Sequence, residues 1–170
     1  MPKLYMVYLG GQATGSNIEV HDVRFVIGEN IEETFHDLRS QWFGELNGLH
    51  MDCYTQIESI DGYRVELKDV PSDSILQPYF VNLGGYDPNV LGELHEDGLF
   101  VAKNANDAKE KALATLLTGT QQTHKDNIMV VDHCLTISKV GSKYLHLTES
   151  VPGKPLKPDW YGYHRIDIQE

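Results

Sequence analysis

The sequence predicts an α+β protein made of two tandem ββαββ repeats, with mixed or antiparallel sheets and one helix in each repeat. The first observation behind this prediction is an internal repeat, because residues 5–42 align with residues 79–116 at an offset of 74 without a gap. The second is that each copy has two runs with a period of two, followed by a run with helical spacing and a further pair of short runs. Two copies of one unit favour a pseudo-twofold arrangement over a solenoid. The identical residues are Tyr5, Val7, Leu9, Gly10, Gly11, Glu19, His21 and Asn30, which meet Tyr79, Val81, Leu83, Gly84, Gly85, Glu93, His95 and Asn104.

The first copy opens with two predicted strands. In LYMVYL the alternate residues Tyr5, Val7 and Leu9 share one face, and Gly10-Gly11 ends the run. An irregular loop leads to EVHDVRFVI, which has the composition of a second strand.

A helix is predicted over residues 30–42. Asn30 is a good N-cap, and Glu33 stands three residues later as its capping-box partner. The helix is followed by CYTQIESI and YRVELK, which are joined by Asp61-Gly62 and predict a hairpin. The apolar stripe of the helix consists of Ile31, Phe35, Leu38 and Trp42.

The second copy predicts the same elements. Its helix is expected over residues 104–116, with Asn104 and Asp107 at the cap positions. Beyond the helix the offset grows to about 80, and the extra residues fall in TGTQQTHKDN, a polar stretch typical of a longer loop. The thinner stripe of this helix consists of Ala108, Ala112, Leu113 and Leu116.

These elements define the predicted boundaries along the chain. The tail begins with several prolines and ends in an aromatic run, which we expect to add a strand or to pack on the core. We predict a first repeat over residues 3–69, a linker over 70–78, a second repeat over 79–149 and an extended tail over 150–170.

Composition narrows the class of protein. Fourteen basic and 25 acidic residues give a net charge of −11, which disfavours nucleic acid as a partner. No apolar run reaches the roughly 20 residues that span a bilayer, and the N-terminal residues lack the features of a signal peptide. Two cysteines, Cys53 and Cys134, are too few for a disulfide framework, so we expect a cytoplasmic protein without membrane partners. The sequence requires no cofactor and leaves a homodimer open.

The doubled unit resembles a known family. The stretches YMVYLGG, NIEVHDVRFVI and DGYRVEL are similar to the bacterial family catalogued as domain of unknown function number 1543, over residues 4–68 and 79–147. This resemblance supports the fold and implies no activity.

The repeated Glu-x-His pairs are the main candidate for a functional site. Residues i and i+2 of a strand share a face, so Glu19 lies beside His21. The same face continues through Val23, Phe25 and Ile27, which predicts that it faces the core. Acidic residues follow both histidines, and glycine pairs stand near both. The candidate binding residues are Gly10, Gly11, Glu19, His21, Asp22, Gly84, Gly85, Glu93, His95 and Glu96.

Three interpretations of the pairs compete. In the first, they hydrogen-bond the backbone of the glycine turns and have a structural role. In the second, they line a pocket for a small ligand. In the third, Glu19, His21, Glu93 and His95 together form a Glu₂His₂ metal site at the repeat junction. A complete catalytic set cannot be assembled from the motifs, so we favour a soluble module that binds a small molecule or a protein. The alternative function is a metal-assisted hydrolytic enzyme.

A second motif carries less weight at this stage. His50-Met51-Asp52 and His124-Lys125-Asp126 both read His-x-Asp. The repeat aligns Asp52 with Asp132 and provides no histidine opposite His50, which argues against a role shared by the two copies.

Overall fold

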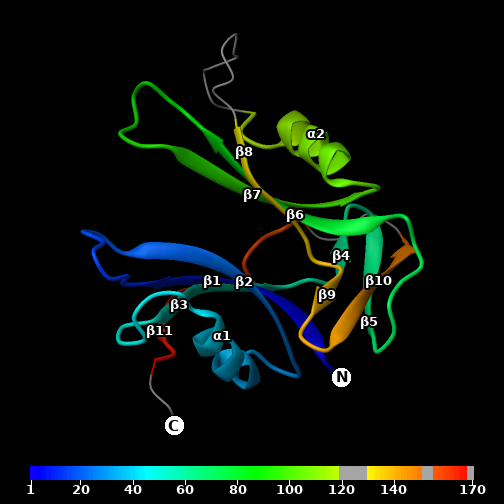
Figure 1. Ribbon diagram of the computed structural model, residues 1–170, viewed down its shortest axis with the longest axis horizontal. Coiled ribbons are helices and arrows are strands. Elements are labelled where there is room, and N and C mark those ends of the chain that lie inside the picture. The colour runs from blue at the N-terminus through cyan, green and yellow to red at the C-terminus, as the bar shows by residue number, and fades with distance from the viewer. Residues whose placement is uncertain (119–129, 151–154, 168–170) are drawn as a thin grey trace. The chain divides into compact units, whose positions relative to one another are not determined.

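The computed structural model describes residues 1–118, 130–150 and 155–167, with the side chains of residues 130–132 excepted. All but the first residue of the predicted loop TGTQQTHKDN lies outside these residues. The described residues form an α+β fold with two α-helices and mostly antiparallel sheets (Figure 1). None of the described helices is long and apolar enough to cross a membrane. In chain order the elements are β1 (Lys3–Gly11), β2 (Val20–Gly28), a 3-10 helix (Glu32–Thr34), α1 (Phe35–Gln41), β3 (His50–Gln56), β4 (Ser59–Ile60), β5 (Tyr63–Lys68), β6 (Gln77–Gly85), β7 (Leu94–Ala102), α2 (Ala105–Thr115), β8 (Val130–Thr136), β9 (Lys139–Val140), β10 (Lys143–Glu149) and β11 (Trp160–Arg165).

The strands form three sheets. Their orders are β11-β3-β1-β2, β4-β5-β10-β9 and β7-β6-β8. The sheet β4-β5-β10-β9 contains hairpin strands from both sequence copies, because β5 pairs with β10 in antiparallel register. The chain divides into two compact units: unit 1 holds residues 1–58, 140–143 and 154–170, and unit 2 holds residues 59–139 and 144–153.

Unit 1 is organised around its central strand β1. Both β2 and β3 pair with β1 in antiparallel fashion, so they flank it on either side and run parallel to one another. Alternate residues of β1 point to one face, which α1 covers (Figure 1). The buried core on this face consists of Tyr5, Val7, Leu9, Val26, Ile31, Leu38, Trp42, Leu49, Met51 and Ile166.

The predicted orientation of β2 is wrong. Val26 lies in the core cluster and Val20 packs against it, so the even-numbered residues of this strand face the helix. His21 and the odd-numbered residues after it therefore point to the opposite face of the sheet. The run Val23, Phe25 and Ile27 misled the prediction because that second face is also half-buried.

Both predicted capping hydrogen bonds form, but only α2 begins directly at its cap. The first helical segment opens as the 3-10 helix Glu32–Thr34 and becomes α-helical at Phe35, so α1 is shorter than the helix predicted over residues 30–42. Asn30 Oδ1 accepts the backbone N–H of Glu33 at 3.0 Å, while the Glu33 carboxylate accepts the N–H of Glu29 at 2.9 Å. Asn104 Oδ1 likewise accepts the N–H of Asp107 at 3.0 Å. The stripe of α2 is narrower than predicted, because Leu113 is 45% exposed.

Unit 2 repeats the strand pairing of unit 1. Gly84 pairs with His95 as Gly10 pairs with His21, which preserves the offset of 74. The β6–β8 register shifts between Asn82 and Leu83, the positions equivalent to the shift between Tyr8 and Leu9 in β1–β3. The buried core of this unit consists of Tyr79, Val81, Leu83, Phe100, Ala102, Ala108, Ala112 and Leu116.

The C-terminal residues close the edge of the first sheet. The aromatic run forms β11, which pairs with β3. Ile166 is buried, and its N–H donates to the Leu49 carbonyl at 3.0 Å. Asp167 accepts the N–H of Gly48 at 2.7 Å and forms a bidentate pair with Arg165. These bonds attach the chain end to the loop that leads into β3.

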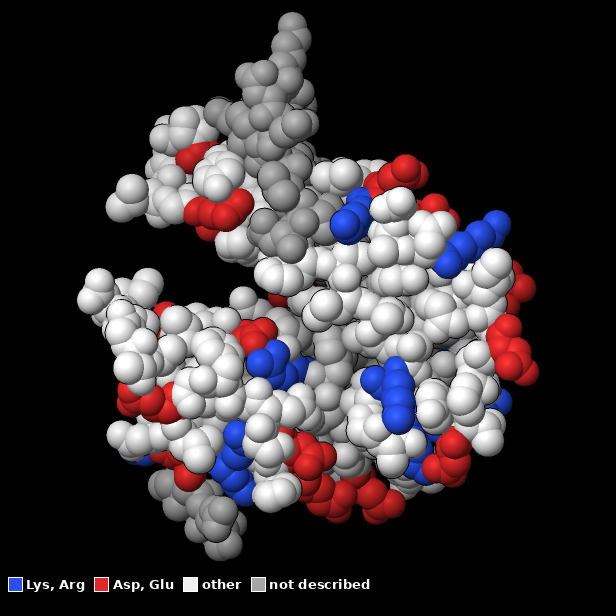
Figure 2. Space-filling view, viewed as in Figure 1, with Lys and Arg blue, Asp and Glu red and all other residues white. Residues whose placement is uncertain are grey.

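Charged side chains are mixed over the face shown in Figure 2. Asp and Glu lie there in several separate groups with Lys and Arg among them. The described residues on this face therefore form no continuous basic surface of the kind that binds nucleic acid.

We predict that Asp167 makes the fold sensitive to acid. The hydrogen bond from Arg165, aided by the Gly48 N–H, lowers the pKa of Asp167 to about 2. The unfolded pKa is about 3.9, so the stabilisation by this carboxylate is complete above that value and is lost as pH falls to about 2. In denaturant unfolding, the difference in stability between wild type and Asp167→Asn should narrow across this interval. Parallel pH dependences of the two proteins would contradict the prediction.

Candidate functional site

The candidate site begins with a row of three residues across the first sheet. Gly10 of β1 pairs with His21 of β2 on one side and with His50 of β3 on the other. Directly paired residues of neighbouring strands point to the same face, which here is the face opposite α1. The two histidines therefore stand on either side of a position that has no side chain.

Gly10 makes this arrangement possible. A Cβ atom at this position would lie 2.5 Å from His50 Nε2 and 3.0 Å from Asp52 Oδ2. Real contacts of a Cβ atom are longer, so any other residue would force the histidine away. The neighbouring Gly11 has a different role, because its Cβ would meet the Trp42 ring on the core face at 2.9 Å.

An irregularity in β3 brings a carboxylate to the same place. The register with β1 passes from Tyr8–Cys53 to Leu9–Met51, so Asp52 is an extra residue without a direct partner. Before this bulge Leu49 and Met51 face the core, and after it Tyr54 packs there. A β-bulge re-aims side chains, and here it leaves Asp52 beside His50.

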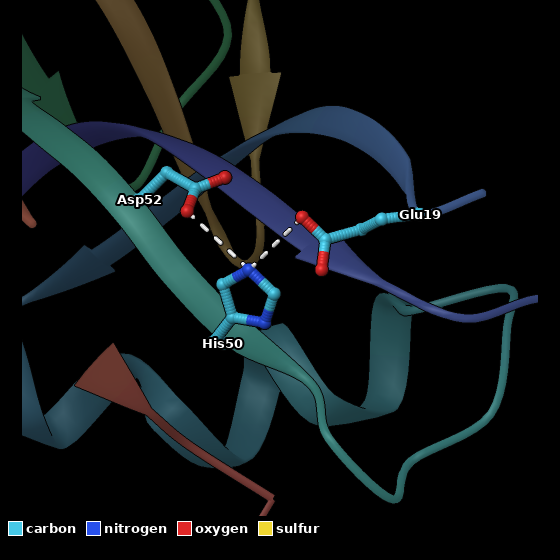
Figure 3. A group of neighbouring side chains, drawn as sticks. All are labelled: Glu19, His50 and Asp52. Atoms are coloured by element: carbon cyan, nitrogen blue, oxygen red, sulfur yellow. Dashed lines mark ion pairs between the residues drawn. The ribbon is translucent and has the colours of Figure 1, made fainter. Parts of the chain in front are cut away.

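Four side chains converge above Gly10. Glu19, which immediately precedes β2, places Oε1 at 3.1 Å from His21 Nε2 and at 3.4 Å from His50 Nε2. Asp52 places Oδ2 at 3.3 Å from His21 Nε2 and Oδ1 at 3.3 Å from His50 Nε2. Figure 3 shows both carboxylates directed at the same ring nitrogen of His50.

Burial and hydrogen bonding fix the orientation of His50. Its side chain is only 2% exposed, while those of Glu19, His21 and Asp52 are 39%, 42% and 30% exposed. His50 Nδ1 lies 2.8 Å from the Gly48 carbonyl, which can only accept, so Nδ1 is the donor. In the neutral ring the lone pair is then on Nε2, which points at the two carboxylates.

Aromatic rings lie against both histidines. The Tyr163 ring is 4.1 Å from the His50 ring between centroids, and the Tyr8 ring is 5.9 Å from the His21 ring. These contacts limit rotation of the imidazoles and leave their Nε2 atoms directed at the centre of the cluster.

The distances between the imidazole nitrogens and the carboxylate oxygens can be compared with those of hydrogen-bonded ion pairs and of ligands that share a metal ion. A charge-assisted N–H···O bond is about 2.7–2.9 Å long. Ligands about 2.05 Å from a tetrahedral zinc ion lie about 3.3 Å from one another. The four nitrogen–oxygen distances are 3.1–3.4 Å, longer than such a bond and close to the separation of two ligands of one ion. One ligand atom from each of Glu19, His50 and Asp52 lies within 4.8 Å of the other two, so these three residues could hold one metal ion. His21 lies outside that group, although its Nε2 contacts an oxygen of each carboxylate.

The other predicted residues of the first copy have different partners. Asp22 lies 2.5 Å from the Arg24 guanidinium and points to the face opposite His21. Gly11 packs against Trp42, as described above. Neither belongs to the cluster of four.

The predicted residues of the second copy lie in unit 2. Glu93 Oε2 lies 3.8 Å from His95 Nε2, and Gly84 pairs with His95 as Gly10 does with His21. Gly85 pairs with Leu94. Glu96 accepts the N–H of Leu117 beyond the end of α2. The residue paired with Gly84 on β8 is Val130, where the first copy has His50.

Unit 2 carries a further carboxyl group on the face of His95. Asp97 accepts a hydrogen bond from Asn82 at 2.8 Å. Burial raises the pKa of Asp97, against the lowering effects of the Asn82 hydrogen bond and of nearby His95. This group has no counterpart in the first copy, where Val23 occupies the equivalent position.

Sequence reasoning gave too little weight to His50 and Asp52. Both belong to the His-x-Asp motif at the start of β3. Placing β1 at the centre of the sheet would have predicted their role. The two strands that flank Gly10-Gly11 then bring the residues paired with these glycines together. No pattern in the sequence indicates the bulge that adds Asp52.

Comparisons with known proteins agree with a duplicated unit. The family model described as Domain of Unknown Function (DUF1543) matches residues 16–67 and 91–138, one segment in each copy. The crystal structure of a protein Il1583 from Idiomarina loihiensis is similar at 34% sequence identity and a TM-score of 0.79, over 98% of this chain and 99% of that one. No curated protein matches the chain.

We predict that Gly10→Ala destabilises the protein through His50. The added methyl group overpacks a site that has no space, which typically costs about 1–3 kcal/mol. His50→Ala should remove the obstacle, so the double variant should lose less stability than the two single losses summed. Denaturant unfolding of the four proteins gives the coupling energy, and additive losses would show that Gly10 does not act through His50.

Proposed function

The chain belongs to the DUF1543 family, and we propose that its first unit binds one divalent transition-metal ion, of which zinc is the simplest candidate. The proposed ligands are Glu19, His50 and Asp52, whose ligand atoms lie together, and His21, which contacts both carboxylates, is the proposed fourth ligand. The chain then acts as a metal-binding module, and the ion is the group through which it engages any further small molecule. The observation that carries the proposal is that two imidazole nitrogens each lie 3.1–3.4 Å from oxygens of the same two carboxylates.

The chemistry of these ligands supports a zinc-type ion. Imidazole nitrogen and carboxylate oxygen together suit zinc and similar first-row metals, whereas calcium and magnesium prefer oxygen alone. A ligand histidine commonly donates its other N–H to a backbone carbonyl, which fixes the ring and makes the free nitrogen more basic. His50 has this arrangement with Gly48.

Charge balance also favours a bound cation. Oxygens of Glu19 and Asp52 lie with His50 Nε2 in a group within 4.8 Å of one another. Two carboxylates at this separation repel, and a dication neutralises both when the imidazoles are neutral.

This proposal shares two residues with the metal site expected from the sequence. Glu19 and His21 keep their assigned role, and His50 and Asp52 of the same unit complete the set. The ion then needs no residue from unit 2, where Glu93 and His95 lie. A site shared by the two Glu-x-His pairs would instead bind less tightly when either pair is removed.

A metal-assisted hydrolytic activity is the second candidate. Its support is the partial exposure of Glu19, His21 and Asp52, which leaves the cluster open to solvent. An ion that is held by three of the four ligands would keep a position for water, as catalytic zinc sites do. Turnover of activated ester and phosphate substrates by zinc-loaded protein, lost in His50→Ala, is the expected result, and no turnover above the apo protein rejects this candidate.

The proposed origin of the two copies is consistent with a single metal site, in unit 1. We propose that both copies derive from one ββαββ unit, which is supported by their equal element order and by the matching register shifts of β3 and β8. The copy with Val130 in place of His50 then lost, or never gained, the buried ligand.

We predict one tightly bound divalent ion per chain. His50→Ala, Glu19→Gln and Asp52→Asn should each reduce metal content because each removes a ligand atom. Glu93→Gln and His95→Ala are the matched controls in the second copy and should retain it. Elemental analysis of protein purified without an affinity tag measures the content, and intense visible absorption after cobalt substitution reports tetrahedral geometry. Metal-free protein that takes up neither ion rejects the proposal, and so does equal loss in the controls.

A further inference from the structure

We propose that Asp167, two residues beyond the C-terminal strand, is a positioning residue that holds His50 in its metal-binding tautomer. The inference rests on the proposed function, because it assigns a task to residues behind one ligand of that site. It concerns a chain of two hydrogen bonds that passes through the peptide groups of Gly48. We call this chain the Asp167–Gly48–His50 relay.

Both hydrogen bonds of the relay are present in the structure. The Gly48 N–H donates to Asp167 Oδ2 at 2.7 Å, and the Gly48 carbonyl accepts from His50 Nδ1 at 2.8 Å. The Asp167 carboxylate is itself held by Arg165 through both of its oxygens. Its side chain is only 5% exposed, so water does not readily replace it.

Backbone conformation makes Gly48 the link. Its φ is +83°, in the left-handed region that favours glycine, and no atom crowds the position of a Cβ. The flanking residue Leu49 is fully buried, and its carbonyl accepts the N–H of Ile166 at 3.0 Å. Residues of the C-terminal segment therefore hold this loop at two neighbouring groups, the Gly48 N–H and the Leu49 carbonyl.

The ring of His50 is also held by this segment. Tyr163 lies against it at 4.1 Å, and Arg165 pairs with His50 in the β11–β3 register. The Arg39 guanidinium donates to the Ile166 carbonyl at 2.9 Å, which secures the segment to α1. The C-terminal residues thus reach His50 from the ring face and through Gly48.

The consequence for the metal is geometric. The Gly48 N–H and the Gly48 carbonyl belong to neighbouring peptide groups, so Asp167 acts by fixing the conformation of Gly48 and with it the direction of the carbonyl that accepts from His50. Donation from Nδ1 to a carbonyl leaves the lone pair on Nε2 and increases its basicity toward a metal. Loss of Asp167 should therefore free the ring to exchange its proton between the two nitrogens.

A matched control lies at the other end of the same strand pair. Asp159 accepts the N–H of Gln56 at 2.7 Å, so it also ties β3 to the C-terminal segment through a carboxylate and a backbone amide. Its bonds reach Thr55 and Gln56 and do not involve Gly48 or His50. Asp159→Ala therefore removes a comparable structural bond without touching the relay.

The test compares Asp167→Ala, Asp167→Asn and Asp159→Ala in the full chain. Nitrogen chemical shifts of His50 in metal-free protein report the ring state, and competition with a chelator gives the dissociation constant for Zn²⁺. We expect wild type and Asp159→Ala to hold the proton on Nδ1. We expect Asp167→Ala to populate the other tautomer and to bind Zn²⁺ about 10–100-fold more weakly. Asp167→Asn, which keeps an acceptor oxygen, should change both quantities in the same direction but less, and it serves if the alanine variant does not fold.

The outcomes separate this inference from the function on which it rests. An unchanged ring state and unchanged Zn²⁺ affinity in both Asp167 variants would overturn the relay, and so would an equal loss of affinity in Asp159→Ala. Wild-type protein that binds no Zn²⁺ would end the metal function. A tautomer shift confined to the Asp167 variants would still establish the positioning role in that case.

Discussion

The arrangement of unit 1 depends on the alternation of side chains along its central strand. The odd-numbered residues of β1 supply the core beneath α1, and Gly11 ends that series against the Trp42 ring. Gly10 points the other way and has no side chain, so the flanking strands can bring His21 and His50 together over it. The same pair of glycines thus closes the hydrophobic core on one face and opens the polar site on the other.

Duplication explains why two copies share a scaffold and differ in chemistry. A change of register by one residue would move every apolar side chain of a strand to the wrong face, so pairing is strongly fixed wherever one face is buried. The shared bulge and the shared Gly–His pairs are consistent with this constraint. The register does not fix the identity of the residue that pairs with the first glycine on the third strand, which is histidine at position 50 and valine at position 130.

The sequence was sufficient for the elements of the fold and insufficient for the site. The offset of 74, the caps at Asn30 and Asn104 and the stripe of α1 depend on local patterns, and the structure contains each of them. The face of β2 was mistaken because alternation identifies two faces without saying which one the helix covers. The partners of Glu19 and His21 were missed because they come from a strand 29 or more residues away, across a glycine and beside an unsignalled bulge.

The electrostatics of the cluster link its chemistry to the C-terminal strand. With neutral imidazoles the four side chains carry two negative charges, and either two protons or one dication can balance them. Both would occupy the same Nε2 atoms, so a metal ion binds only as those protons leave. The buried His50 is the ligand with least freedom to adjust, because Gly48 already takes the proton of its other nitrogen and Tyr163 lies against its ring. Under the proposed metal function, the residues that fix His50 would therefore present its Nε2 to an ion between Glu19 and Asp52.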